Sequence, residues 1–164
     1  MTNSPLYGIL LPVCAAAAVL SSAGSADAKQ FKNARYDFVV NVPDNFMALP
    51  EPANGDGRAF VLMANEDVSL RFYARLKQGE DSIARVCEAE IPDGADNSDM
   101  TLNRRDCYIY YDYEGLHTEL FVFLVRGAFY FGISTVPVSQ QQSYQDVFHK
   151  VFVSWKIHGN PTVY

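Results

Sequence analysis

The stretch from Leu116 to Arg126 most constrains the fold, because it is apolar at both sets of alternating positions. A β-strand places successive side chains on opposite faces. The two faces would carry Leu120, Val122 and Leu124 on one side and Phe121, Phe123 and Val125 on the other. An antiparallel sheet with one wet face should alternate apolar and polar residues instead. We therefore expect a central strand that is covered on both sides.

Two helices could supply this cover. The clearer one has apolar residues at i, i+3, i+4, i+7, i+8 and i+11, namely Tyr144, Val147, Phe148, Val151, Phe152 and Trp155. Ser139 and Gln142 have the spacing of a capping box before it, and Gly159 follows it. The other predicted helix runs from Gly79 to Ile91, with an apolar stripe formed by Ile83, Val86, Cys87 and Ile91.

The remaining strands follow from alternation and turn residues. The predicted strands are 35–42, a hairpin of 58–64 and 68–75 that turns at 65–67, and a meander of 106–113, 116–126 and 128–136. Segments 50–57 and 92–100 are predicted loops, because turn-forming and polar residues fill them. This order predicts an α+β fold with an antiparallel sheet of about six strands sandwiched by helices.

The first 28 residues have the layout of a secretory signal peptide. An apolar block from Leu6 to Leu20 precedes the cleavage motif Ala26-Asp27-Ala28. Cleavage after Ala28 would leave one globular domain, 29–164, in the periplasm or secreted. A retained anchor is a weaker hypothesis, because Pro12 interrupts the apolar run and a membrane-spanning helix needs about 20 residues. Lipidation at Cys14 is another, although bulky Val13 precedes that cysteine.

Loss of the leader would leave Cys87 and Cys107 as the only cysteines. In an oxidising compartment such a pair predicts a disulfide, which would be worth about 3 kcal/mol for a loop of about 20 residues. Redox catalysis is the alternative, but the chain has no C-x-x-C motif.

Composition and motifs exclude several functions. The net charge of −6 and the lack of a Lys/Arg cluster argue against nucleic acid as a partner. The chain has no nucleophile elbow, no phosphate-binding glycine motif and no zinc-binding histidine spacing. We therefore expect no catalytic residues, metal ion or cofactor, and no membrane span in the mature chain.

Short motifs at both ends of the mature chain resemble one known family. The segment 36–46, Y-D-F-V-V-N-V-P-D-N-F, is similar to the "Y-x-F-x-V-x-x-P-x-x-F" start of PsbP-like domains. The segment 151–155, V-F-V-S-W, resembles their closing "I-x-x-S-F", and Asn54 to Arg58 resembles exported bacterial members of unknown role. The resemblance implies an α/β/α sandwich about an antiparallel sheet. It implies no particular activity, because a fold can host unrelated functions.

The candidate binding residues come from two strands. Tyr108 and Tyr110 share one face of their strand and could line a groove with Arg71, Tyr73 and Arg75, which would suit an acidic or ring-bearing partner. Tyrosines packed at a sheet margin with wet hydroxyl groups explain the same pattern more simply.

The leading hypothesis is an exported, non-enzymatic domain that binds or helps to assemble another component of the cell envelope, most simply a protein. The second is a small periplasmic hydrolase or transferase that uses the Tyr/Arg face, with His117 or Asp112 as the acid–base group. The third is a Ca²⁺- or carbohydrate-binding module built on Asn54 to Arg58.

Overall fold

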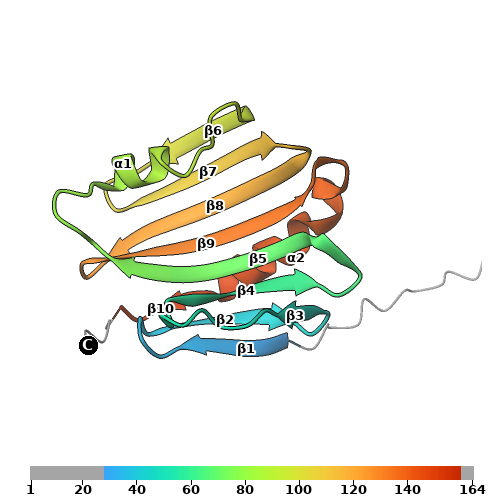
Figure 1. The fold of residues 1–164 in the computed structure, drawn as a ribbon, viewed down its shortest axis with the longest axis horizontal. Helices are drawn as coiled ribbons and strands as arrows, with labels where there is room; N and C mark the ends of the chain where they lie inside the picture. Colours follow the sequence, from blue (N-terminus) through green and yellow to red (C-terminus); the bar gives the residue numbers. More distant parts are fainter. Residues whose placement is uncertain (1–27, 160–164) are drawn as a thin grey trace, which may run out of the picture.

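The computed structural model describes residues 28–159, which form two antiparallel sheets and two α-helices (Figure 1). The larger sheet has the strand order β3 (Phe46–Ala48), β4 (Gly57–Leu62), β5 (Asn65–Leu76), β9 (Ala128–Pro137), β8 (Leu116–Val125), β7 (Asp106–Tyr113) and β6 (Asp96–Leu102). The smaller sheet has the order β1 (Ala28–Asn33), β2 (Phe38–Pro43) and β10 (Lys156–Ile157). The fold is therefore α+β, as expected, but strands dominate it.

Strand β8 lies between β7 and β9, inside the larger sheet. Its Leu120 and Val122 are buried on one face, and Phe121 and Phe123 contact the rings of Phe152 and Trp155 on the other. The predicted cover on both sides is confirmed, but the predicted central position is not. The middle position of the sheet belongs to β9.

Helix α1 (Ile83–Glu88) covers one face of the larger sheet, which we call the α1 face. The apolar side of α1 packs on Ile109, Leu120, Val122, Phe129 and Phe131. A disulfide joins Cys87 of α1 to Cys107 of β7, with their Cα atoms 6.6 Å apart, so the predicted pairing is confirmed. The helix is shorter than predicted because Gly79 has a φ of +48° and the Ser82 side chain caps the first turn.

Helix α2 (Gln141–Ser154) and the smaller sheet cover the opposite face, which we call the α2 face. The helix lies behind the larger sheet in Figure 1. It approaches β9 closely at Gly132, where a Cβ atom would lie 2.7 Å from Trp155. The predicted capping box is wrong: Ser139 lies in a 3₁₀ turn (Val138–Gln140), and no side-chain hydrogen bond caps α2.

Three further predictions need correction. One sheet of about six strands was predicted, but the described residues form a seven-stranded sheet and a separate three-stranded sheet, in which β1 and β10 pair with β2. Residues 96–100 of the predicted loop 92–100 belong to edge strand β6. Within residues 28–159 this strand pairs only with β7, and its residues are mostly exposed, so it needs no apolar face. The β4–β5 hairpin turns at Met63 and Ala64, before the predicted position, next to a register shift at Val61/Leu62.

The predicted signal peptide spans residues 1–28. Residues 1–27 lie outside the described residues, and Ala28 is the first residue of β1. Within residues 28–159, neither helix has the length and apolar character that crossing a bilayer requires.

Candidate functional site

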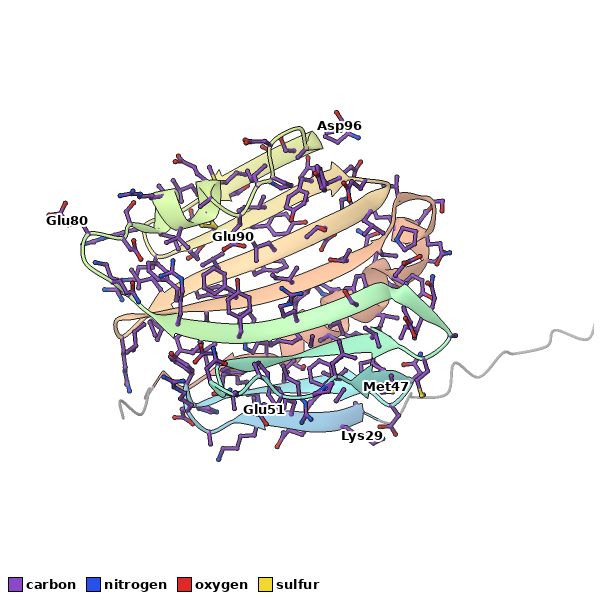
Figure 2. All side chains as sticks on the ribbon, in the orientation of Figure 1. Lys29, Met47, Glu51, Glu80, Glu90 and Asp96 are labelled. Carbon is purple, nitrogen blue, oxygen red and sulfur yellow. A yellow bond between two sulfur atoms is a disulfide. The ribbon has the colours of Figure 1, made fainter. Side chains whose placement is uncertain are left out.

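A pocket of about 480 Å³ lies on the α1 face, over β4 and β5; we call it the Arg71 pocket. Its lining residues are Leu49, Pro50, Pro52, Asn54, Asp56, Gly57, Arg58, Ala59, Arg71, Tyr73, Ala74 and Arg75. In Figure 2 the labelled Glu51, between two lining prolines, and Glu90, which follows α1, lie on either side of β5. The pocket therefore combines three of the predicted binding residues with the 50–57 loop.

Aromatic packing holds two of these predicted residues in place. The Tyr73 ring stacks on Phe131 with 4.5 Å between centroids and an interplanar angle of 3°. The Arg75 guanidinium lies 5.1 Å from the centre of the Phe129 ring and forms an ion pair of 2.9 Å with Asp81. Arg75 is thus already engaged within the chain.

Arg71 differs from Arg75 because it is exposed and has no such partner. Within residues 28–159, no hydrogen bond or ion pair engages its guanidinium. Its charge does act on Glu90, whose pKa is raised by burial and lowered to a smaller extent by Arg75 and Arg71. Burial also raises the pKa of Tyr73, with Glu90 adding to the effect, so the Tyr73 hydroxyl stays protonated at neutral pH. Arg71 is therefore a basic group of this pocket whose donors are all open to a ligand.

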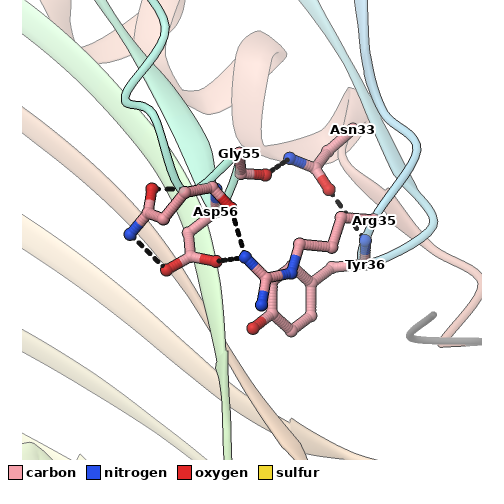
Figure 3. A network of polar contacts seen from close by, with 6 residues as sticks. Asn33, Arg35, Tyr36, Gly55 and Asp56 are labelled. Atoms are coloured by element: carbon pink, nitrogen blue, oxygen red, sulfur yellow. Dashed lines mark hydrogen bonds and ion pairs between the residues drawn. The ribbon is translucent and has the colours of Figure 1, made fainter. Parts of the chain in front are cut away.

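The rim of the pocket is fixed by polar contacts to the turn after β1 (Figure 3). The Asn33 side chain donates to the Gly55 carbonyl at 2.9 Å and accepts from the Tyr36 backbone N–H at 2.8 Å. Arg35 forms an ion pair of 2.8 Å with Asp56 and also donates to the Asn54 carbonyl. The smaller sheet therefore positions the loop that borders the pocket.

These contacts bear on the Ca²⁺ hypothesis for this loop. Asp56 binds Arg35 through one carboxylate oxygen and accepts from the Asn54 side chain at 2.6 Å through the other. Its oxygens are thus engaged inside the chain. Gly57 serves packing, since a Cβ atom there would lie 2.1 Å from the Phe72 carbonyl oxygen. No cluster of three or more potential metal-binding side chains (His, Cys, Asp or Glu) occurs in the described part of the chain.

The five predicted binding residues do not form one groove. Residues directly opposite each other on neighbouring strands point to the same face of a sheet. Across the four strands the opposed residues are Tyr108, Phe121, Gly132 and Phe72. Tyr108 therefore shares a face with Phe72 rather than with Tyr73. Tyr108 and Tyr110 therefore lie on the α2 face, whereas Arg71, Tyr73 and Arg75 lie on the α1 face. The error arose because strand order and register cannot be read from each strand alone.

The suggested acid–base pair also lies on the α2 face. His117 is buried, and its Nδ1 lies 2.6 Å from Asp112 Oδ1. Its Nε2 lies 3.0 Å from the Gln141 amide nitrogen, which can donate to it, so one neutral tautomer satisfies both contacts. Hydrogen bonds from Asn97 and His117 lower the pKa of Asp112. This pair joins β7 and β8 to the start of α2 and is separated from Arg71 by the sheet.

Arg58 was predicted only as part of the Asn54 to Arg58 segment of the third hypothesis, and Phe121 was not predicted as a site residue. Arg58 lines the Arg71 pocket, and its Nε donates to the Leu49 carbonyl at 3.0 Å. Phe121 stands opposite Tyr108, at 4.6 Å between ring centroids. The predicted strands 106–113 and 116–126 leave a two-residue turn at Glu114 and Gly115. Such a turn sets the register of its hairpin, so it implies the pairing of Tyr108 with Phe121.

Comparisons with known proteins bear on the fold. No protein-family model and no curated protein sequence matches the chain. Among solved structures, the cyanobacterial PsbP (CyanoP) of Synechocystis sp. PCC 6803 is similar, with a TM-score of 0.58, 12% identity, and coverage of 84% of this chain and 96% of that one. A Bacteroides thetaiotaomicron protein has a TM-score of 0.53 and 16% identity, over 83% of this chain and 50% of its own. At these identities the likeness concerns architecture, and the fold of this chain is PsbP-like.

Proposed function

We propose that this chain is an exported, non-enzymatic domain that binds another protein of the cell envelope through the Arg71 pocket. Export is supported by the leader-like residues 1–28 and by the disulfide, which persists in oxidising compartments. The observation that carries the binding role is the exposed Arg71 guanidinium, which has no hydrogen bond or ion pair within the described chain.

The chemistry of the pocket indicates the kind of group it would bind. Arginine offers a planar set of donors that matches a carboxylate. The Tyr73 ring, Pro50 and Pro52 add apolar surface beside it, and buried contacts of this kind supply much of the energy of protein interfaces. An acidic side chain next to an apolar or aromatic one, on a partner protein, fits this combination.

The test is cross-linked affinity capture from the envelope fraction, with quantitative mass spectrometry. The bait is the mature chain, wild type or with Arg71→Gln, and Arg104→Gln serves as a matched control on the exposed loop between β6 and β7. We expect wild type and Arg104→Gln to recover the same dominant protein, and Arg71→Gln to recover about tenfold less. Equal recovery by Arg71→Gln, or no specific protein with wild type, would refute the proposal.

The second candidate function is a small hydrolase or transferase on the Tyr/Arg face. The Arg71 pocket supplies a concave surface, which favours it. His117 and Asp112 lie across the sheet, however, and the Tyr73 hydroxyl is held protonated. Turnover of an ester, phosphate or glycoside that disappears in one polar variant would replace the binding proposal with this one.

A further inference from the structure

A second and smaller pocket, of about 200 Å³, lies on the α2 face; we call it the Tyr108 pocket. Strands β7 and β8 and helix α2 line it with Tyr108, Glu119, Phe121, Gln145, His149 and Phe152. Pockets for drug-sized ligands are typically about 300–1,000 Å³. This one therefore has room for a small group only.

Three of its walls are aromatic. The centroid of the Phe121 ring lies 4.6 Å from that of Tyr108 and 4.6 Å from that of Phe152. Tyr110 continues the series at 6.1 Å from Tyr108. The three lining rings are half-buried, so they keep solvent-accessible surface at the pocket. Aromatic faces carry partial negative charge and attract cations.

The fourth wall carries the carboxylate of Glu119. Glu119 is half-buried, with 22% of its side chain exposed, and makes no hydrogen bond through that side chain within residues 28–159. The nearest basic atom is Nε2 of His117, at 3.7 Å. That nitrogen also lies 3.0 Å from the side-chain amide nitrogen of Gln141, so Glu119 is not its nearest polar contact.

The charge of Glu119 affects the pKa of the neighbouring Tyr108. Burial, followed by the charge of Glu119, raises the pKa of Tyr108 to about 12. Tyr108 thus stays neutral, with its ring available as a wall. Burial and the Glu119 charge both disfavour a second negative charge at Tyr108.

We propose that the Tyr108 pocket binds a small organic cation with a quaternary ammonium group, of the choline type. A trimethylammonium group has no N–H to satisfy, so aromatic faces and one carboxylate suffice to hold it. The site is independent of the Arg71 pocket, which lies on the other face of the sheet. Such a group could reach it as a free solute or as the headgroup of a phosphatidylcholine lipid.

The first measurement is titration of the mature protein with choline, by calorimetry and by NMR of the aromatic side chains. The matched ligand control is 3,3-dimethylbutan-1-ol, which has the shape of choline and carries no charge. We expect saturable shifts at Tyr108, Phe121 and Phe152, with binding of the neutral alcohol at least about tenfold weaker. Equal binding of both ligands, or no saturable binding of choline, would overturn the proposal.

Variants then test the two components of the site. Glu119→Gln keeps the shape and removes the charge, Tyr108→Leu removes a ring, and Glu114→Gln changes an exposed carboxylate in the β7–β8 turn as a control. We expect each of the first two to raise the Kd for choline about tenfold and the control to leave it unchanged. An unchanged Kd in Glu119→Gln would contradict the role of the carboxylate.

A vesicle assay separates the two sources of the cation. Co-sedimentation with phosphatidylcholine vesicles that free choline competes away would identify the lipid headgroup as the source. Choline binding without co-sedimentation would identify a free solute. Both outcomes support the site, whereas co-sedimentation that choline does not compete away and Glu119→Gln does not weaken would contradict it.

Discussion

At the scale of single residues, five carboxylates of the described chain form two contrasting groups. Asp56, Asp81 and Asp112 each accept from a nearby donor, and those donors lower the pKa of Asp81 and Asp112. Glu90 and Glu119 are half-buried without such a bond. The first group fixes the positions of its neighbours, and the second leaves negative charge beside each proposed binding pocket.

Glu90 leads to a prediction about pH. Its pKa is raised in the folded state, so the folded protein binds more protons than the unfolded one between the unfolded value of about 4.3 and the raised value. Stability attributable to Glu90 therefore falls as pH rises through this range. We expect Glu90→Gln to unfold at a higher urea concentration than wild type at pH 7, with the difference disappearing as pH falls below about 4.

The matched control is Glu88→Gln, which changes an exposed carboxylate at the end of α1. It should leave the urea midpoint unchanged at both pH values. A lower midpoint for Glu90→Gln at pH 7 would show that its attraction to Arg71 and Arg75 outweighs its burial.

At the scale of elements, α1 and β6 depend on β7. Strand β6 is an edge strand that pairs only with β7, and α1 packs on the same part of the sheet. The disulfide closes the segment between Cys87 and Cys107, which contains all of β6. It therefore restricts the least covered edge of the larger sheet.

The double substitution Cys87→Ala with Cys107→Ala tests this role. We expect the free energy of unfolding to fall by about 3 kcal/mol, because the unfolded chain gains the freedom of an open loop. Hydrogen exchange should accelerate most in α1 and β6. Urea unfolding and exchange mass spectrometry measure both effects.

The same bond can be checked without substitution. Alkylation of freshly exported protein in the absence of reductant should give no gain in mass. Two alkylated thiols would refute a structural disulfide in the compartment that we propose.

At the scale of the whole molecule, the two sheets share one hydrophobic core. Trp155 lies between them, with ring contacts to Phe38 of β2 at 6.3 Å and Phe72 of β5 at 5.2 Å. Phe31 of β1 contacts Phe38 and also Phe60 of β4. We therefore expect the sheets to unfold together, as one domain.

Phe31→Ala tests this coupling. The loss of a half-buried ring should cost about 2 kcal/mol, and Trp155 fluorescence should still report one transition that coincides with the loss of β-sheet circular dichroism. Gln30→Ala, on the exposed side of the same strand, should change little. Two separate transitions would show that the smaller sheet is an independent unit.

Local patterns predicted the strand 116–126 and the helix carrying Tyr144 to Trp155, which the structure contains as β8 and α2. They were predictable because residues buried on both faces of a strand, or along one side of a helix, recur at regular spacing. The meander and the disulfide were predictable for similar reasons. Edge strand β6 was not, since a strand that buries little has no apolar alternation. The Arg71 pocket was half predictable: its residues on β5 were identified, but not the loop that closes over them.

The sequence by itself determined which segments carry apolar faces, which cysteines pair and that the chain folds as α+β, because these properties follow from the order and spacing of neighbouring residues. Only the tertiary structure decided that Tyr108 and Tyr110 lie across the sheet from Arg71, Tyr73 and Arg75. The physical reason is that a shift of one residue in strand register exchanges the two faces of a sheet, and register between distant strands depends on all the contacts of the core.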